Sequence, residues 1–203
     1  MTASVGGIVL AGGAGTRLGA DKALLKFGGR TLLEIAVERL SEVTGDVVVA
    51  CGAGTRPGWP EVDARTVTDR VAGRGPLAGV DAALRAIVGE TAIVVACDMP
   101  FLNPALLSHM VDSLAAHEAV VPMIDGRYHA LHAVYSKQCL PAVETMLQRG
   151  GSMRDLLAVA DTKAMSEDEV RAIDPEALSC FNLNSPGDLD TARALWVRER
   201  LGT

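Results

Sequence analysis

The spacing of apolar residues along the chain predicts strands that alternate with helices. Short, unbroken apolar runs are typical of strands that helices cover on both faces. Such runs occupy residues 5–11, 46–50 and 93–95. Apolar residues at helical spacing fill the intervals between these runs and much of the second half. They occupy residues 31–43, 77–88, 104–115, 137–148 and 186–201.

Capping residues support several of these helices. Thr31 is expected to cap the first one, because Glu34 lies three residues further on and completes a capping box. Pro76 and Pro104 each stand at the start of a helical pattern, and Asn103 is the expected cap of the second of these. Alternating elements of this kind predict a three-layer α/β/α domain with a mostly parallel central sheet.

Weaker patterns predict shorter elements elsewhere. Strands are expected at residues 66–68, 119–122 and 129–135, and a short helix after Ser152. Residues 166–176 are acidic and are expected to form a solvated turn or a short helix. No repeat, low-complexity tract or Pro/Ser-rich linker divides the chain, so we expect residues 1–203 to form a single domain.

Composition narrows the class of protein. The chain has 203 residues, enough for one domain that buries about 70% of its unfolded surface. It carries 19 basic and 25 acidic residues, a net charge of −6, and only 3% of its residues are aromatic. Both values argue against a nucleic-acid partner, which needs a basic surface or stacking side chains.

Cysteine spacing and hydropathy bear on the compartment. The four cysteines are far apart and lack zinc-ligand spacing, so we expect buried, reduced thiols. No run approaches the ~20 apolar residues of a membrane span, and residues 1–9 lack the pattern of a signal peptide. We therefore expect a cytoplasmic protein that does not contact membranes.

The glycine-rich segment at residues 10–22 reads LAGGAGTRLGADK and is the first sign of chemistry. Glycines after a strand let the backbone turn sharply and point N–H groups inward, which suits phosphate oxygens. Arg17 and Lys22 add positive charge, so a nucleoside triphosphate would fit there. A mobile glycine-rich turn with two solvated cations is the alternative.

Two common phosphate-binding fingerprints do not match this segment. A Walker A loop needs Gly-Lys-Ser/Thr, whereas Lys22 lies between Asp21 and Ala23. A dinucleotide-binding fingerprint that includes Gly13 would need its third glycine where Leu18 stands.

Two further segments are candidates for ligand contact. Asp98 follows a buried strand, at the edge where open α/β sheets bind ligands, and a carboxylate there can hold Mg²⁺ against triphosphate oxygens. A helix cap before Pro100 is the alternative role for Asp98. Residues 75–79 open a helix whose free N–H groups suit an anion or a base edge, unless they form only a proline-started cap.

The histidines offer less. His129 and His132 lie three apart on an expected strand, so their side chains should point to opposite faces. They are therefore not expected to form a joint metal site, and structural roles are the simpler interpretation.

Four segments together resemble the molybdenum cofactor guanylyltransferase family of nucleotidyltransferases. They read LAGGAGTRLGADK at 10–22, GPLAG at 75–79, CDMPFL at 97–102 and NLNSP at 182–186. In this order they extend over nearly the whole chain. The resemblance implies a Rossmann-like nucleotidyltransferase domain with a nucleotide-binding half at about residues 1–105 and an acceptor-binding half at about residues 106–203.

The resemblance also implies roles for individual residues. It assigns catalysis to Arg17, Lys22 and Asp98, with Asp98 as the metal ligand. It assigns nucleotide contact to Leu10, Ala11, Gly12, Gly13, Gly15, Lys22, Asp69, Gly75, Pro76, Leu77 and Asp98. A solvated turn residue is the alternative for Asp69.

Asn182 and Asn184 are assigned to the acceptor side by the same resemblance. They lie two apart on a short extended segment, hence on one face, where paired amides could bind a polar pterin. Turn formation before the last helix is the alternative for this pair.

The implied reaction is transfer of GMP from GTP to the terminal phosphate of the molybdenum-pterin cofactor, with Mg²⁺ bound and pyrophosphate released. Transient contacts with proteins that supply or receive the cofactor are also expected. Cytidylyl transfer, or nucleotidyl transfer to another phosphorylated acceptor, stays open, and so does a non-catalytic adaptor that binds nucleotide and delivers cofactor.

Two positions bear on the choice of base. Gly12 and Gly13 favour guanine, because related cytidylyltransferases tend to carry Leu-Ala-Ala-Gly there. Resembling enzymes often place a polar side chain such as Asn after the second strand, whereas Cys51 and Gly52 offer no side-chain amide.

Overall fold

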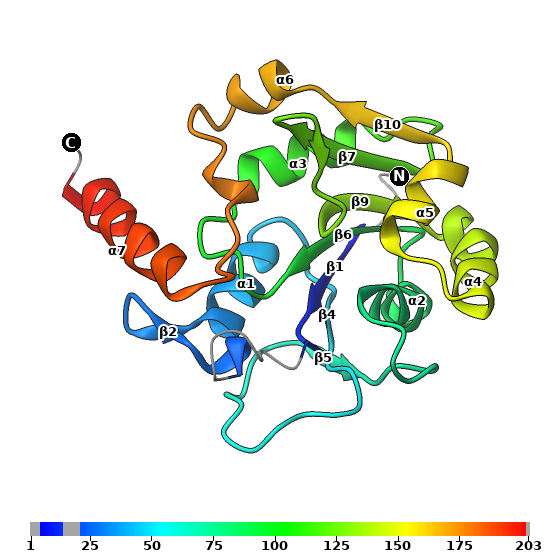
Figure 1. Ribbon diagram of the computed structural model, residues 1–203, viewed down its shortest axis with the longest axis horizontal. Coiled ribbons are helices and arrows are strands. Elements are labelled where there is room, and N and C mark those ends of the chain that lie inside the picture. Colours follow the sequence, from blue (N-terminus) through cyan, green and yellow to red (C-terminus); the bar gives the residue numbers. More distant parts are fainter. Residues whose placement is uncertain (1–4, 14–20, 202–203) are drawn as a thin grey trace.

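An eight-stranded sheet runs through the middle of this computed structural model, which describes residues 5–13 and 21–201 (Figure 1). The strand order is β10-β7-β9-β6-β1-β4-β5, with β8 paired to β7. The strands are β1 (Val5–Leu10), β4 (Val47–Ala50), β5 (Arg65–Val67), β6 (Thr91–Ala96), β7 (Ala119–Ile124), β8 (Arg127–Tyr128), β9 (His132–Ser136) and β10 (Thr162–Met165).

Strand direction brings several strand ends to one edge of the sheet. β1 pairs in parallel with both β4 and β6, so that Leu10 is level with Ala50 on one side and Ala96 on the other. β4 and β5 are parallel, as are β7 and β10, whereas β9 runs antiparallel to β6 and β7. The sheet is therefore mostly parallel, as predicted, and β1, β4 and β6 end side by side.

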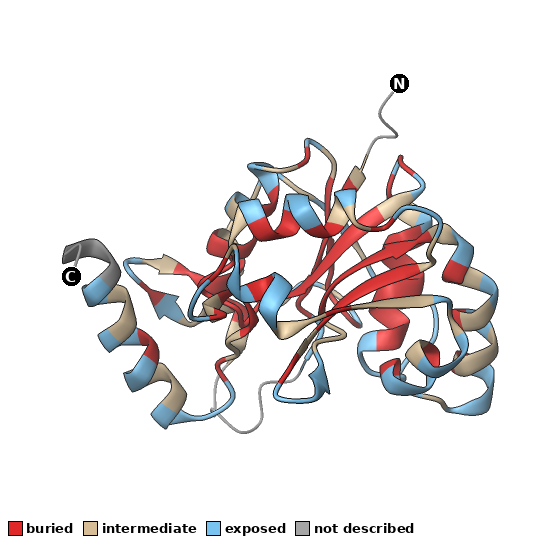
Figure 2. Cartoon of the chain, turned by 90° about the horizontal axis from the view of Figure 1, so that it is seen from above, coloured by how far each residue is buried: buried red, intermediate tan, exposed pale blue. Residues whose placement is uncertain are grey.

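Helices cover both faces of the sheet. They are α1 (Leu32–Ser41), α2 (Pro76–Ala86), α3 (Pro104–Asp112), α4 (Leu140–Arg149), α5 (Met153–Val159), α6 (Glu167–Arg171) and α7 (Pro186–Leu201). One hydrophobic cluster joins the sheet to α1, α3 and α6, and a second joins the other face to α2, α4 and α5. Buried strands between partly exposed helices give the three predicted layers (Figure 2). Within the described part of the chain, no helix is both long and apolar enough to cross a membrane.

The chain pattern explains this layering. In β1, Ile8 and Leu10 face the cluster under α2, whereas Val9 faces the cluster under α1. Both faces of β1 are buried, so both carry apolar side chains, and the sequence of β1 shows an unbroken apolar run instead of an alternating pattern. The capping box of α1 is confirmed, since the Glu34 backbone N–H donates to Thr31 Oγ1 at 3.2 Å and the Thr31 backbone N–H donates to Glu34 Oε2 at 2.7 Å.

A third cluster lies at one side, where α7 leaves the body of the molecule (Figure 1). There α7 packs against the hairpin of β2 (Lys26–Phe27) and β3 (Arg30–Thr31). We call four of its rings the aromatic cluster: Phe27, Phe101, Phe181 and Trp196. Ring centroids lie 4.9 Å apart for Phe27 and Trp196 and 5.6 Å apart for Phe27 and Phe101.

Some element bounds differ from the predicted ones. β9 begins at His132 instead of residue 129, because the His132 N–H donates to the His129 carbonyl in a turn. The helix expected at 104–115 ends at Asp112, and Ala115 adopts a left-handed φ of 46° that no helix continues. The helix expected at 137–148 is split into η2 (Lys137–Cys139) and α4.

Candidate active site

A cavity of about 660 Å³ lies at the edge where β1, β4 and β6 end, beside the start of α2. Parallel α/β sheets bind ligands at this edge, beyond the carboxyl ends of their strands. Its walls consist of Leu10, Gly12, Gly13, Lys22, Ala50, Gly52, Ala53, Asp69, Gly73, Gly75, Pro76, Gly79, Ala96, Cys97, Asp98, Leu131 and Asn184.

Lys22 is the centre of the polar contacts in this cavity. Its Nζ lies 2.6 Å from Asp98 Oδ2, with which it forms an ion pair, and 2.9 Å from Asn184 Oδ1. Lys22 begins the 3₁₀ turn η1 (Lys22–Leu24), which Asp21 caps by accepting from the Ala23 N–H at 3.1 Å. The cavity thus joins three segments that are remote in sequence.

Backbone contacts hold those segments together. Asp98 follows β6, and the N–H of Cys97 donates to the Leu10 carbonyl at 3.1 Å. The N–H of Leu183 donates to the Asp98 carbonyl at 2.9 Å, which brings Asn184 to the same place. We refer to Lys22, Asp98 and Asn184 as the polar triad.

The aromatic cluster is formed by the same three segments as the polar triad. Phe27 lies five residues after Lys22, Phe101 lies three residues after Asp98, and Phe181 lies three residues before Asn184. Each segment that contributes a polar group therefore also contributes a ring.

Asp98 has the features of a cation ligand. Its side chain is 12% exposed, and its Oδ1 is buried without a hydrogen-bond partner among the described residues. A buried oxygen of this kind is costly unless a ligand satisfies it. No group of three or more His, Cys, Asp or Glu residues in the described ranges could hold a metal. A single carboxylate of this kind can contribute to a divalent-cation site whose other ligands are substrate oxygens and water.

Asp69 is a second carboxylate on the cavity wall. Its N–H donates to the Gly52 carbonyl at 2.7 Å, which ties the end of β5 to the loop after β4. Its side chain makes no hydrogen bond within the part of the chain that the structure describes, and burial raises its pKa. Asp69 thus offers free acceptor oxygens to a ligand with N–H or O–H groups.

Glycines let the backbone close around the cavity. A Cβ on Gly12 would lie 2.8 Å from the Cα of Gly52, so the two backbones touch. Gly52 has a φ of +67° and Gly75 a φ of +60°, both in the left-handed region that favours glycine. Gly75 precedes α2 without a side-chain cap, and its carbonyl accepts from the Ala78 N–H at 3.2 Å.

The structure brings together most of the predicted site residues that it describes. Those that line the cavity are Leu10, Gly12, Gly13, Lys22, Asp69, Gly75, Pro76, Asp98 and Asn184. Ala11 and Leu77 are buried in the core instead, each at most 2% exposed. Gly15 and Arg17 lie outside the described residues.

The asparagine pair is divided in the structure. Asn184 lines the cavity, whereas Asn182 does not, and its Oδ1 is buried without a partner among the described residues. Leu183 between them is fully buried in the third cluster. The joint acceptor role of the pair stays a prediction.

Burial shifts the pKa of three other side chains near this edge, those of His129, His132 and Cys97. His132 is fully buried with Nε2 2.6 Å from Ser179 Oγ, and burial lowers its pKa to about 4. Burial also lowers the pKa of His129. The Cys97 thiol lines the cavity, but burial raises its pKa to about 12, so it is not a thiolate nucleophile at neutral pH.

Eight residues that line the cavity were not among the predicted site residues: Ala50, Gly52, Ala53, Gly73, Gly79, Ala96, Cys97 and Leu131. Gly52 was considered only for the amide that it lacks, although its place after a buried strand could have indicated a backbone contact. Leu131 precedes the antiparallel strand β9. The sequence of a strand that lies between β6 and β7 does not show which strands it will pair with.

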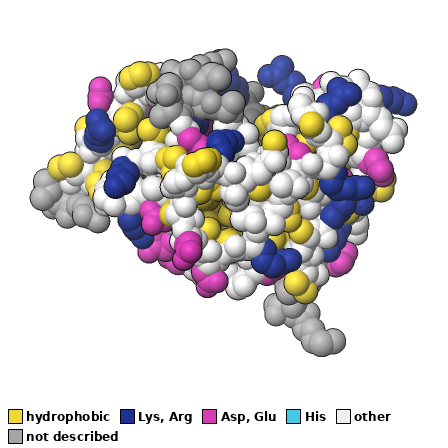
Figure 3. Space-filling view, turned by 90° about the horizontal axis from the view of Figure 1, so that it is seen from below, with side chains coloured by type: hydrophobic (Ala, Val, Ile, Leu, Met, Phe, Trp, Pro, Cys, Tyr) yellow, Lys and Arg dark blue, Asp and Glu magenta, His cyan; other side chains and the backbone are white. Residues whose placement is uncertain are grey.

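Acidic and basic side chains are interspersed around a mostly uncharged middle region on the face in Figure 3.

Comparison with known proteins defines the family. The description of the matching family is the MobA-like NTP transferase domain, and the match covers residues 7–167, most of the chain. The chain belongs to this family. MobA-like NTP transferases with similar sequences include a probable molybdenum cofactor guanylyltransferase of Pelotomaculum thermopropionicum, 34% identical over 97% of this chain and 95% of that protein.

Two further relatives agree with this assignment. A probable molybdenum cofactor guanylyltransferase of Mycobacterium avium is 36% identical over 90% of this chain and 92% of that protein. The crystal structure of molybdopterin-guanine dinucleotide biosynthesis protein A from Archaeoglobus fulgidus is similar, with a TM-score of 0.81 and 27% identity over 95% of this chain and 99% of that chain. The MobA-like fold therefore extends over nearly the entire sequence.

Proposed function

We propose that this MobA-like protein transfers GMP from GTP to the terminal phosphate of the molybdenum-pterin cofactor. The observation that carries the proposal is the polar triad, in which a lysine, a carboxylate with one unpaired oxygen and an amide meet in a cavity at the ligand-binding edge of the sheet. The names of the relatives support guanine as the base and the molybdenum-pterin cofactor as the acceptor.

Different residues of the site bind different parts of the nucleotide. In this proposal Lys22 binds triphosphate oxygens together with Arg17 and the N–H groups of the glycine-rich segment. Asp98 holds Mg²⁺, and Asp69 accepts hydrogen bonds from the nucleoside. The chemistry that Mg²⁺ at Asp98 supplies is neutralisation of the triphosphate and of the leaving pyrophosphate.

The reaction needs no covalent intermediate with the protein. An oxygen of the acceptor phosphate forms a bond to the α-phosphorus of GTP, and the bond between that phosphorus and the oxygen bridging to the β-phosphate breaks. The electron pair leaves with pyrophosphate. The acceptor is already an anion, so the protein acts by alignment and by stabilising charge, to which Lys22 contributes.

The two halves of the chain take different substrates in this proposal. The nucleotide half covers about residues 1–105, and most cavity residues come from it. The acceptor half covers about residues 106–203 and reaches the cavity through Leu131 and Asn184. Transient contacts with proteins that supply or receive the cofactor belong to the same proposal.

Substitution of Lys22 or Asp98 tests the proposed roles. We expect Lys22→Met and Asp98→Asn to stay folded, because each new side chain is close in size to the one that it replaces, and to lower GMP transfer by about a hundredfold or more. The measurement is pyrophosphate release with GTP, Mg²⁺ and molybdenum-pterin cofactor. Arg39→Ala, which removes an exposed pair with Glu42 on α1, is the control. Transfer near the unaltered rate in either site variant would contradict the assignment.

The choice of base and the alternative functions need a second assay. Each of the four labelled nucleoside triphosphates is incubated with protein, Mg²⁺ and cofactor, and GTP is expected to be used fastest. Equal or faster use of CTP would contradict the choice of guanine as the base. GTP binding without pyrophosphate release would favour the non-catalytic adaptor.

A further inference from the structure

The loop between β4 and β5 makes an unexpected contact with the residue before Lys22. Arg56 and Trp59 both come from this loop. Arg56 forms an ion pair with the Asp21 carboxylate, and Trp59 donates a hydrogen bond to it. Arg56 Nη1 lies 2.7 Å from Asp21 Oδ1, and Trp59 Nε1 lies 2.7 Å from Asp21 Oδ2. The Ala23 N–H donates to Oδ1 as well, so Ala23 and Trp59 donate hydrogen bonds to the carboxylate and Arg56 pairs with it as a cation.

Arg56 also reaches the end of β1. Its Nη2 donates to the Ala11 carbonyl at 3.3 Å, and its guanidinium carbon lies 5.5 Å from the centroid of the Trp59 ring. One side chain therefore joins Ala11, which directly follows β1, to Asp21, which directly precedes Lys22. A planar guanidinium can serve two acceptors in this way because its donors are held in a rigid fork.

These contacts set the position of Lys22. The flexible Lys22 side chain reaches Asp98 and Asn184 only if its backbone starts from a fixed place. The Asp21 carboxylate, held by Arg56 and Trp59, provides that place and caps η1 at the same time.

Stability alone is a weak reason for this arrangement. The Arg56 side chain is 30% exposed, and partly exposed ion pairs contribute about 1 kcal/mol or less to folding. Its two acceptors nevertheless lie on either side of the segment that opens the candidate site. A role in ligand binding explains that placement better than a role in folding.

We propose that Arg56 is a positioning residue for Lys22: by binding Asp21 and Ala11 it holds the backbone that presents the Lys22 ammonium to a triphosphate. Trp59 assists by binding the second oxygen of Asp21. This inference rests on the proposed function, since it takes Lys22 to be a triphosphate-binding group.

Direct binding of GTP with Mg²⁺, without acceptor, tests the proposal. We expect Arg56→Ala to raise the Kd for GTP about tenfold, because a phosphate-binding side chain that is no longer pre-positioned must be ordered on binding. Trp59→Phe keeps the ring and removes only the donor, so a smaller rise is expected. Calorimetric titration gives the Kd, and thermal denaturation gives the Tm of the same samples.

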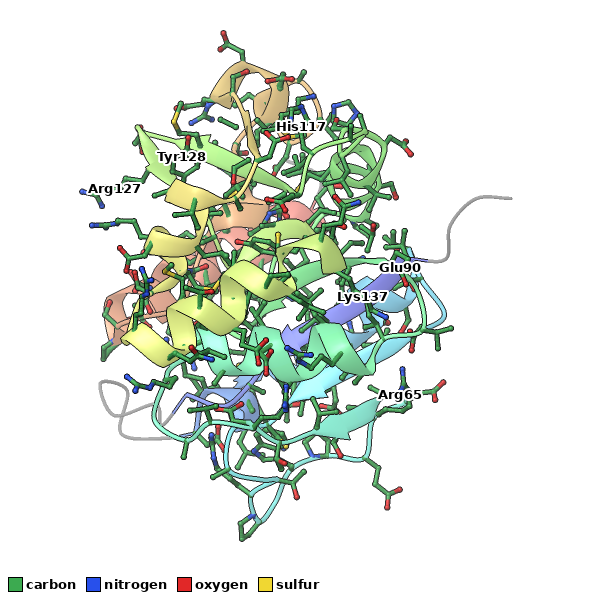
Figure 4. All side chains as sticks on the ribbon, turned by 90° about the vertical axis from the view of Figure 1, so that its right-hand side faces the viewer. Arg65, Glu90, His117, Arg127, Tyr128 and Lys137 are labelled. Atoms are coloured by element: carbon green, nitrogen blue, oxygen red, sulfur yellow. The ribbon has the colours of Figure 1, made fainter. Side chains whose placement is uncertain are left out.

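Arg65→Ala is a matched control. Arg65 also binds a carboxylate and a carbonyl, those of Asp46 and Ala86. It lies at the first residue of β5, however, and Figure 4 shows it at the same end of the sheet as Glu90 and Lys137. We expect Arg65→Ala to lower the Tm as much as Arg56→Ala does and to leave the Kd for GTP unchanged. Equal Kd values for the two variants would overturn the positioning role. If Arg56→Ala proves unfolded, Trp59→Phe carries the same comparison.

A double variant separates positioning from direct contact. If Arg56 acts through Lys22, the Lys22→Met variant and the Lys22→Met, Arg56→Ala variant should have the same Kd for GTP. Additive losses would mean that Arg56 touches the nucleotide itself, and the positioning role would be wrong. Failure of the unaltered protein to bind GTP would overturn the proposed function and this inference together. Loss of binding in Lys22→Met with unchanged binding in Arg56→Ala would overturn only the inference.

Discussion

At the scale of single residues, the shape of the cavity depends on two glycines, because a side chain at either position would push the backbone segments apart. Gly12 and Gly52 come from the ends of two neighbouring strands, and their backbones touch. The N–H groups around a phosphate can approach one another this closely only where no Cβ intervenes. These two glycines therefore form a part of the cavity wall where two backbone segments touch.

A methyl group at Gly12 tests this point. We expect Gly12→Ala to lower the free energy of unfolding by about 2 kcal/mol, because the new Cβ meets backbone that must shift. In a chain of this size that corresponds to a fall in Tm of about 4 to 8 °C. Thermal denaturation is the measurement.

Gly45→Ala is the control for that substitution. Gly45 is exposed, and a Cβ there would meet no atom within 4 Å. We expect its Tm to stay level or to rise slightly, since alanine reduces the freedom of the unfolded chain. Equal Tm values for the two variants would mean that the contact between Gly12 and Gly52 is not tight.

Residues in the site differ in how far the sequence could predict them. Asp98 stands just after a buried strand and Lys22 ends the glycine-rich segment, and the structure places both in one cavity. Asn182 and Asn184 are two residues apart and were predicted to lie on one face, yet only Asn184 lines the cavity. Arg56 gave no signal, because its acceptors are a carbonyl and a carboxylate that become neighbours only in the folded chain.

At the scale of elements, the polar triad is held by hydrophobic contacts. The hairpin of β2 and β3, the turn after β6 and the segment before α7 meet through the aromatic cluster. Phe101 is in its middle, with neighbouring rings at 5.6 and 6.1 Å on Phe27 and Phe181. Loss of this ring should loosen all three segments.

We expect Phe101→Ala to lower the free energy of unfolding by about 3 to 5 kcal/mol and also to weaken GTP binding. Leu107→Ala is the control, because Leu107 is fully buried in α3 but belongs to the cluster under α1, away from the aromatic rings. It should lower stability and leave the Kd of the folded protein unchanged. The Kd is measured well below both melting temperatures. A Phe101→Ala protein that binds GTP normally would contradict the anchoring role of the cluster.

Helices with a cap or a regular apolar period could be predicted from the sequence, whereas very short strands and outer strands could not. The capping box of α1 and the Asn103 cap of α3 were confirmed, since each is made within four residues of chain. The bounds of α7 matched the prediction as well. The hairpin of β2 and β3 was missed because strands of two residues show no period, and β10 was missed because an outer strand is defined by its partner.

At the scale of the whole molecule, one buried histidine links distant parts. His132 lies at the start of β9 and contacts Ser179, whose hydroxyl also accepts from the Asn103 N–H at 3.0 Å. The Ser179 N–H in turn donates to Asp174 at 2.8 Å. This network joins the sheet, the start of α3 and the turn before the last helix.

The network predicts that stability depends on pH. Burial holds the pKa of His132 at about 4, whereas in the unfolded chain it is close to 6.5. The unfolded state therefore binds a proton that the folded state does not, and stability falls as the pH drops through this window. We expect a loss of about 3 kcal/mol from this residue between those two pH values.

Denaturant unfolding at several pH values measures this dependence. His132→Gln should unfold with a shallower pH dependence than the unaltered protein, and His109→Gln, at an exposed position on α3, should follow the unaltered protein. Equal slopes for His132→Gln and the unaltered protein would show that His132 is not the group responsible.

The distance in sequence between the members of the polar triad has a consequence for synthesis. Lys22 and Asn184 are 162 positions apart. On a ribosome that adds roughly 5–20 residues per second, β1, β4 and β6 are complete several seconds before Asn184 is made. The nascent chain can pack its first strands and helices during that time, but it cannot yet join Phe181 and Trp196 to the rings already present. We therefore expect the ability to hold a triphosphate to appear only near the end of translation, after the central sheet.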